Sequence, residues 1–110
     1  MDPATLELAD RLAVQRLKYV RQRSMRNPKW RDADYLAKFV QRRYLRWAPN
    51  TPLEPQRVGV EEALKDYRKA AGGSDRAVLD ARWVAVQDSV DTLIAEAERL
   101  SGHRIKPRAI

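Results

Sequence analysis

The spacing of apolar residues in the first part of the chain predicts a helix. Apolar side chains recur there every three or four positions, which places them on one helical face. The helix begins after Asp2, a capping residue, with Pro3 in its first turn, and it fades near Ser24. Its predicted buried face comprises Leu6, Ala9, Ala13, Leu17 and Val20, widened by Leu8, Leu12 and Tyr19.

A second helix is predicted to begin after Asp32 or Asp34, since both are good capping residues. Pro49 ends it, because proline has no backbone N–H to donate and clashes with the preceding turn. Its apolar side comprises Leu36, Phe39, Val40 and Trp47. Residues 48–57 contain three prolines and predict a stiff, extended connector.

The C-terminal half predicts two helices separated by a glycine pair at residues 72 and 73. The shorter one extends from about Val58 to Ala71. Ser74 or Asp75 caps the longer one, which reaches about Ser101, with Gly102 as its C-cap. The apolar stripe of the shorter helix comprises Val60, Ala63, Leu64, Tyr67 and Ala71.

The long helix carries a heptad pattern, because its apolar positions are separated alternately by four and three residues. Such a seam either packs inside the bundle or meets a neighbouring protomer or partner subunit. Trp83 lies on the seam and is predicted to be a core residue. The seam comprises Leu79, Trp83, Val86, Val90, Leu93, Ala97 and Leu100.

No stretch shows the long apolar–polar alternation of a strand, so the predicted fold class is all-α. We expect a small bundle of about four helices with a long C-terminal helix. The length of 110 residues suits one domain, which we place at residues 1–102. Residues 103–110 are expected to form a loose, basic C-terminal tail.

Composition narrows the cellular setting. The chain has no cysteine, which excludes disulfides and thiolate metal sites and fits a reducing compartment. It shows neither the apolar segment of a signal peptide nor the roughly 18 apolar residues of a membrane span. We therefore expect a cytoplasmic protein without a membrane partner.

Positive charge is concentrated in the N-terminal half. The net charge is +7, and residues 1–57 carry 13 basic against 6 acidic side chains, whereas residues 58–110 carry 9 of each. Arginine outnumbers lysine 16 to 6, and arginine binds phosphate through a fork of donors and stacks on bases. A GC-rich genome explains that ratio equally well, but it does not explain the asymmetry. The asymmetry favours a polyanionic partner.

The candidate nucleic-acid-binding residues lie on both N-terminal helices and between them. On a helical wheel, Arg11, Lys18 and Arg21 fall together opposite the predicted core face, whereas Arg16 and Arg23 fall at its edge. Tyr35 flanks a basic row on the second helix and is placed to stack on a base. That row comprises Lys38, Arg42 and Arg46, and the intervening segment adds Arg26, Lys29 and Arg31 beside Trp30. A solvated helix face is the plainer interpretation of any one row.

Catalytic chemistry has little support in the sequence. His103 is the one histidine, so no histidine pair can hold a metal or act in catalysis. Asp88 and Asp91 are neighbours on one helix turn, but an exposed acidic face explains them better than Mg²⁺ binding. We therefore expect no catalytic residues, no metal and no cofactor.

In size, helical character, positive charge and lack of cysteine, the chain resembles the small subunits of CRISPR effector ribonucleoproteins. The resemblance spans the whole chain through these general features and no residue motif, so no site residue is carried over from it. It implies a non-catalytic helical bundle in antiviral defence. Several copies would lie along a guide-bound filament and contact nucleic-acid backbone and neighbouring subunits.

The leading hypothesis is thus a subunit that binds RNA or single-stranded DNA backbone inside a larger ribonucleoprotein, beside other protein subunits or copies of itself. A second hypothesis is a phage or plasmid structural or adaptor protein whose basic face meets an acidic protein. A third is a helical DNA-binding regulator. It is the weakest, because neither the proline-rich connector nor the glycine pair forms a clear short turn before a recognition helix.

Overall fold

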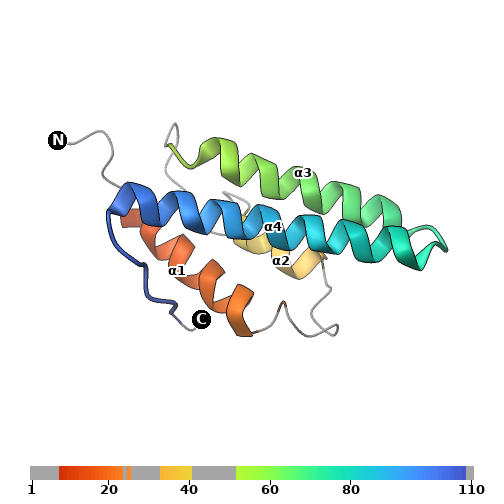
Figure 1. Cartoon of the computed structure of the whole chain (residues 1–110), viewed down its shortest axis with the longest axis horizontal. Coiled ribbons are helices and arrows are strands. Elements are labelled where there is room, and N and C mark those ends of the chain that lie inside the picture. Colours follow the sequence, from red (N-terminus) through yellow and green to blue (C-terminus); the bar gives the residue numbers. More distant parts are fainter. Residues whose placement is uncertain (1–7, 24, 26–32, 41–51, 109–110) are drawn as a thin grey trace.

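A computed structural model of the chain describes residues 8–23, 25, 33–40 and 52–108. Within these ranges the chain forms helices and no strands, which confirms the all-α prediction. The helices are α1 (Leu8–Arg23), α2 (Ala33–Val40), α3 (Glu54–Ala71) and α4 (Arg76–Ser101) (Figure 1). As predicted, the longest helix is the C-terminal one.

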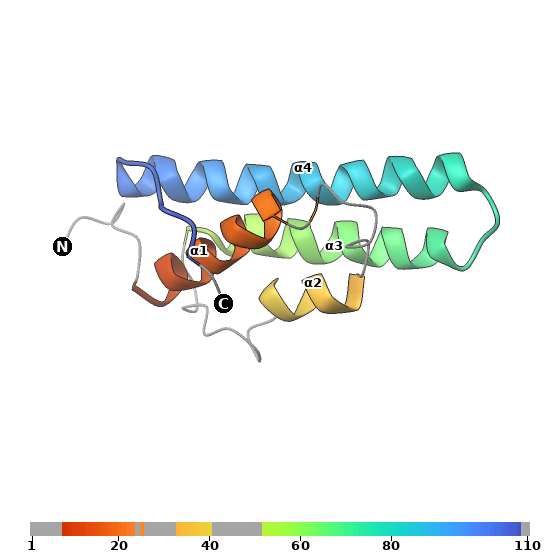
Figure 2. The same ribbon diagram turned by 90° about the horizontal axis from the view of Figure 1, so that it is seen from below.

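An antiparallel hairpin of α3 and α4 supports the other two helices, with α1 packed on α4 and α2 packed on α3 (Figure 2). The long helix begins and ends where the sequence predicts. The Asp75 side chain accepts hydrogen bonds from the N–H groups of Ala77 (3.0 Å) and Val78 (3.2 Å). At the other end Gly102 adopts a left-handed φ of 76°, which a residue without Cβ reaches at no steric cost.

The heptad seam of α4 packs inside the chain. Trp83, Val86, Val90, Leu93 and Ala97 are all buried, with Leu79 and Leu100 partly buried at its two ends. The ring centroids of Trp83 and of Tyr67 in α3 lie 5.2 Å apart, with the two rings tilted relative to each other. Of the two interpretations of the heptad, the structure therefore favours internal packing, with the seam as the centre of the core.

The third helix begins four residues earlier than predicted, at Glu54. The prediction of an extended connector is therefore wrong for residues 54–57. Pro55 stands in the first helical turn, where the backbone N–H would have no intrahelical partner in any case. Ala71 is exposed rather than part of the apolar stripe. The beginning of the predicted connector, residues 48–51, lies outside the described ranges.

The early start of α3 brings a charged residue, Arg57, into the core with only 7% of its surface exposed. Its guanidinium donates to Glu54 (2.7 and 3.1 Å) and to Glu61 (2.6 Å). A further hydrogen bond of 2.9 Å reaches the carbonyl oxygen of Val40, the last residue of α2. The Glu54 hydrogen bond, partly opposed by burial and reinforced by Glu61, raises the pKa of Arg57 above its usual value. Arg57 therefore fastens the end of α2 to α3.

The buried face of α1 differs from the predicted one. Ala13, Leu17 and Val20 are buried as expected, but Val14 is fully buried as well, whereas Leu12 is 39% exposed. The predicted face also included Leu6, Leu8 and Ala9, whose side chains lie outside the described part of the structure. The true face is turned towards Val14, and this rotation changes which basic residues face solvent.

The predicted loose tail is wrong for residues 103–108, here called the C-terminal strap. Ile105 is 2% exposed and belongs to the core cluster. Its N–H donates to the Glu98 carboxylate of α4 (2.9 Å), and the N–H of Arg108 donates to the carbonyl oxygen of Gln15 in α1 (3.1 Å). The strap thus runs back from the end of α4 beside α1 (Figures 1 and 2). Residues 103–108 therefore pack against α1 and α4.

Candidate nucleic-acid interface

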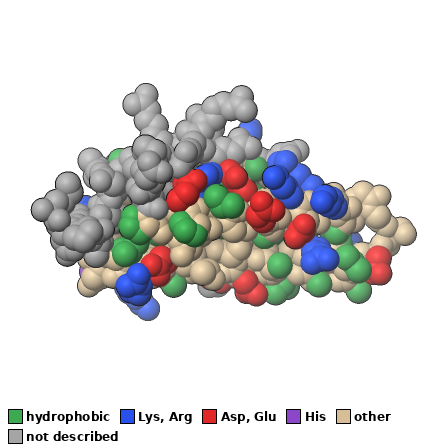
Figure 3. Space-filling model, turned by 90° about the horizontal axis from the view of Figure 1, so that it is seen from above, with side chains coloured by type: hydrophobic (Ala, Val, Ile, Leu, Met, Phe, Trp, Pro, Cys, Tyr) green, Lys and Arg blue, Asp and Glu red, His purple; other side chains and the backbone are tan. Residues whose placement is uncertain are grey.

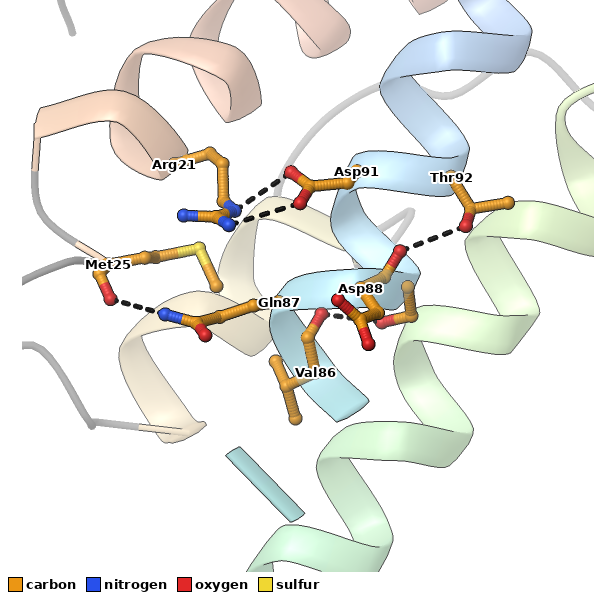
Figure 4. Close-up of polar contacts among 8 residues, drawn as sticks. Arg21, Met25, Val86, Gln87, Asp88, Asp91 and Thr92 are labelled. Atoms are coloured by element: carbon orange, nitrogen blue, oxygen red, sulfur yellow. Dashed lines mark hydrogen bonds and ion pairs between the residues drawn. The ribbon is translucent and has the colours of Figure 1, made fainter. Parts of the chain in front are cut away.

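Lys18 and Arg21 do not lie opposite the core face, as predicted, but at the border between α1 and α4. The Lys18 Nζ atom lies 2.7 Å from Glu98 Oε2, and the Lys18 side chain is 13% exposed. Arg21 makes a two-pronged contact with the Asp91 carboxylate, at 2.8 and 3.0 Å (Figure 4). The physical reason is the rotation of α1. Lys18 follows Val14 by four residues and Arg21 follows Leu17 by four, so both sit beside buried positions.

The end of α1 is held to α4 by a further contact that does not involve charge. Gln87 of α4 donates a hydrogen bond of 2.8 Å to the carbonyl oxygen of Met25, whose side chain is 1% exposed (Figure 4). Together with the Arg21–Asp91 contact, it fixes the last turn of α1 against the middle of α4. The Lys18 and Arg21 charges thus hold helices together, and each is matched by an acid of the same chain.

Glu98 is the point where α1, α4 and the strap meet. One of its oxygens accepts hydrogen bonds from both Lys18 and the Ile105 N–H. Partial burial by itself raises the pKa of Glu98. The Lys18 and Ile105 hydrogen bonds and the charges of Lys18 and Arg104 outweigh that effect, so the pKa lies below its usual value. The carboxylate is therefore held in its charged form.

The remaining predicted site residues divide into two groups. Arg11 is partly buried near the start of α1, and Lys38 is exposed on α2. The other predicted residues lie outside the described part of the structure, and so do the side chains of Trp30 and Tyr35. Those predicted residues are Arg26, Lys29, Arg31, Arg42 and Arg46.

The structure brings together basic residues that lie far apart in the sequence and were not predicted as one group. The strap places Arg104, Lys106 and Arg108 beside α1, all three exposed, and Arg11 and Gln15 lie against the strap. We call the set of Arg11, Arg104, Lys106 and Arg108 the basic α1–strap surface. Its cations come from opposite ends of the chain, and the nearby acid Glu98 interacts with both Lys18 and Arg104. Arg16 and Arg23 are further exposed cations of α1.

A signal for the strap was present in the sequence. Residues 104–108 alternate basic, apolar, basic, Pro, basic, the pattern of an extended segment with one face buried. A single apolar isoleucine is too short a pattern to separate a packed strap from a loose tail. The helical wheel placed Arg16 and Arg23 at the edge of the apolar face, and both are exposed in the structure.

The opposite end of the hairpin carries exposed charges of both signs. Exposed Lys65, Lys69 and Arg82 alternate with exposed acids such as Glu62 and Asp66 on α3. In Figure 3 the face of the molecule that carries α3 shows red and blue side chains interspersed, with hydrophobic ones between them. Such a surface has a small net potential, whereas the four residues that define the basic α1–strap surface are all cations.

The described residues contain no group of three or more His, Asp or Glu side chains that could hold a metal ion. Among the same residues, no helix combines the length and apolar character that crossing a bilayer requires. No protein-family model, curated protein or solved structure matches the chain. The site is therefore defined by its geometry and charge alone.

Proposed function

We propose that this chain is a non-catalytic helical subunit that binds the backbone of RNA or single-stranded DNA within a larger ribonucleoprotein. The observation that carries the proposal is the basic α1–strap surface, where the strap's contacts hold cations from both chain ends on one side of the molecule. Phosphate groups would meet Arg104, Lys106 and Arg108 in place of solvent. Binding through phosphates supplies affinity without reading sequence.

The residues assigned to this role differ from the set expected from the sequence. Lys18 and Arg21 are left out, because moving them to phosphate would leave Glu98 and Asp91 without their partners. Arg11 and Lys38 remain in the proposal as a partly buried and an exposed cation. Arg26, Lys29, Arg31, Arg42 and Arg46 stay predictions from the sequence.

A more specific form of the proposal is a small-subunit role in a CRISPR effector ribonucleoprotein. Its support is the chain length, the all-helical fold and the positive charge. In this role several copies would line a guide-bound filament. Co-expression with guide-RNA-binding subunits should then yield a complex that contains the chain in several copies. Purification of the chain apart from an otherwise complete guide complex would contradict this specific form.

The test of nucleic-acid binding is fluorescence anisotropy with single-stranded RNA, single-stranded DNA and duplex over a series of salt concentrations. The key variant reverses the strap charges, as Arg104→Glu, Lys106→Glu and Arg108→Glu. We expect log Kd to depend less steeply on log salt, by roughly 0.7–0.9 for each phosphate group that the variant no longer binds. Affinity should fall alike for all sequences.

A matched control reverses three exposed charges at the other end of the hairpin, as Lys65→Glu, Lys69→Glu and Arg82→Glu. Both triple variants lower the net charge from +7 to +1, so only the position of the change differs. The proposal requires the strap variant to lose much more affinity than the control. If the two variants lose the same affinity, binding depends only on the net charge and not on the strap. If the native protein binds no polynucleotide, the proposal is wrong.

A further inference from the structure

A cavity of about 260 Å³ lies where the strap crosses the start of α1. Its described lining contains four residues with basic side chains and one amide, and no carboxylate. The cavity is smaller than the roughly 300–1,000 Å³ of sites for drug-sized ligands, which suits a small anion. The lining residues are Arg11, Gln15, His103, Arg104, Ile105 and Lys106.

The walls of this cavity are held in place by contacts within the chain. Ile105 anchors the strap by burial, and its N–H donates to Glu98. The Arg108 N–H donates to the carbonyl oxygen of Gln15, itself a lining residue. The ring Nδ1 of His103 lies 3.0 Å from the carbonyl oxygen of Ser101, a distance that lets Nδ1 donate to it. The backbone of the strap is therefore held beside α1, and a ligand need not first order it.

From this arrangement we propose that the cavity is a binding site for a dianionic phosphate monoester. Arg11 and Arg104 present guanidinium groups, which bind phosphate oxygens in pairs, and Lys106 adds a third full positive charge. Three positive charges match a dianion better than the single charge of an internal phosphodiester. The ligand is either a phosphate at the end of a nucleic-acid strand or a small free phosphate ester. This site does not depend on backbone binding along the rest of the molecule.

Calorimetric titration of the full chain with inorganic phosphate and with sulfate tests the site directly. We expect saturable binding at one site per chain, and Arg104→Gln should weaken it about tenfold, the effect of losing about one charged hydrogen bond. Arg16→Gln is the matched control, because Arg16 is an exposed α1 arginine that does not line the cavity. It should leave phosphate affinity unchanged.

A second variant tests the geometry rather than the charge. Ile105→Ala removes the buried anchor but keeps every cation, so it should weaken phosphate binding, with circular dichroism confirming that the helices persist. If phosphate does not bind the native chain, or if Arg16→Gln weakens binding as much as Arg104→Gln, the site does not exist. Preserved binding in a folded Ile105→Ala protein would equally overturn it.

The two possible sources of the phosphate are separated with oligonucleotides that differ only at one end. Where the ligand is a strand terminus, a 5′-phosphorylated oligonucleotide binds more tightly than its 5′-hydroxyl twin, and the difference disappears in Arg104→Gln. Where it is a small free ester, inorganic phosphate binds and the two oligonucleotides are equivalent. Either result, together with the phosphate titration, supports the monoester site. Polynucleotide binding can fail while phosphate binding succeeds, so the two proposals are judged separately.

Discussion

Arg57 is a cation inside the core, and the oxygen atoms that surround it come from two helices. Its exposed fraction of 7% contrasts with that of the Glu54 and Glu61 side chains, which are 29% and 34% exposed. The guanidinium therefore bears most of the cost of burial, while the carboxylates keep part of their hydration. It also donates a hydrogen bond to the carbonyl oxygen of Val40 in α2.

Replacing Arg57 by Met should lower the free energy of unfolding by about 3 kcal/mol. The value is at the low end for breaking a buried ion pair, because the carboxylates of Glu54 and Glu61 remain partly hydrated. Urea denaturation measures the change, with the exposed Arg82→Met as the control, expected to stay within about 0.5 kcal/mol of the native protein. A loss for Arg57→Met no greater than that of Arg82→Met would show that the cluster does not fasten α2.

The role of Arg57 could be only half predicted. The spacing of Glu54, Arg57 and Glu61 by three and four residues is visible in the sequence, and it places all three on one helix face. Their burial is not visible, because it depends on where α2 ends and on α3 starting at Glu54. By contrast, the burial of Trp83 followed from its heptad position, since a large apolar group at such a position has few alternatives.

At the scale of elements, capping residues predicted helix ends well and prolines predicted them poorly. Asp75 and Gly102 act through local backbone geometry, so their effect can be read from neighbouring residues. Pro55 is compatible with both a connector and a first helical turn, and tertiary packing decides between them. The strap depends on one buried side chain, Ile105, and on a contact with Gln15 about 90 positions away, which no local pattern encodes.

Acid should release the strap before it unfolds the hairpin. The folded pKa of Glu98 lies below its ordinary value of 4.5, so the unfolded state binds more protons between these two values. The stabilisation is therefore complete above about pH 4.5 and is lost as the pH falls through the folded pKa. Amide exchange of Ile105 and Arg108, followed by NMR from pH 6 to 3, should accelerate relative to exchange within α4 after correction for intrinsic rates.

Glu98→Gln isolates this carboxylate from the other acids of the chain. The variant keeps an acceptor for the Ile105 N–H but loses the charge that Lys18 and Arg104 stabilise. Its strap should exchange faster at pH 6 and show little extra acceleration on acidification. If acidification accelerates exchange in the variant as steeply as in the native protein, the pH dependence belongs to another group.

Across the whole molecule, not all of the positive charge of the N-terminal half can bind a partner. Lys18 and Arg21 form ion pairs with acids of α4, and Arg57 forms ion pairs with acids of α3. Lys18 and Arg21 lie in the N-terminal half, whereas the acids that pair with them lie in the C-terminal half. The difference in charge between the two halves of the sequence is therefore partly cancelled in the folded molecule. The strap then carries cations from the balanced C-terminal half to the side of α1.

Exchanging the partners of one ion pair separates charge that holds the fold from charge that binds phosphate. Arg21→Asp alone places two carboxylates at the α1–α4 border and should cost roughly 1 kcal/mol of unfolding free energy, as expected for a partly exposed pair. Adding Asp91→Arg restores an opposite-charge pair and should recover most of that loss in urea denaturation.

The double variant keeps the net charge at +7 but moves the cation from α1 to α4. Since Arg21 serves packing here, the double variant should bind polynucleotides with native affinity and an unchanged salt slope. A slope reduced by nearly one unit in a stable double variant would instead mean that Arg21 leaves Asp91 to bind phosphate.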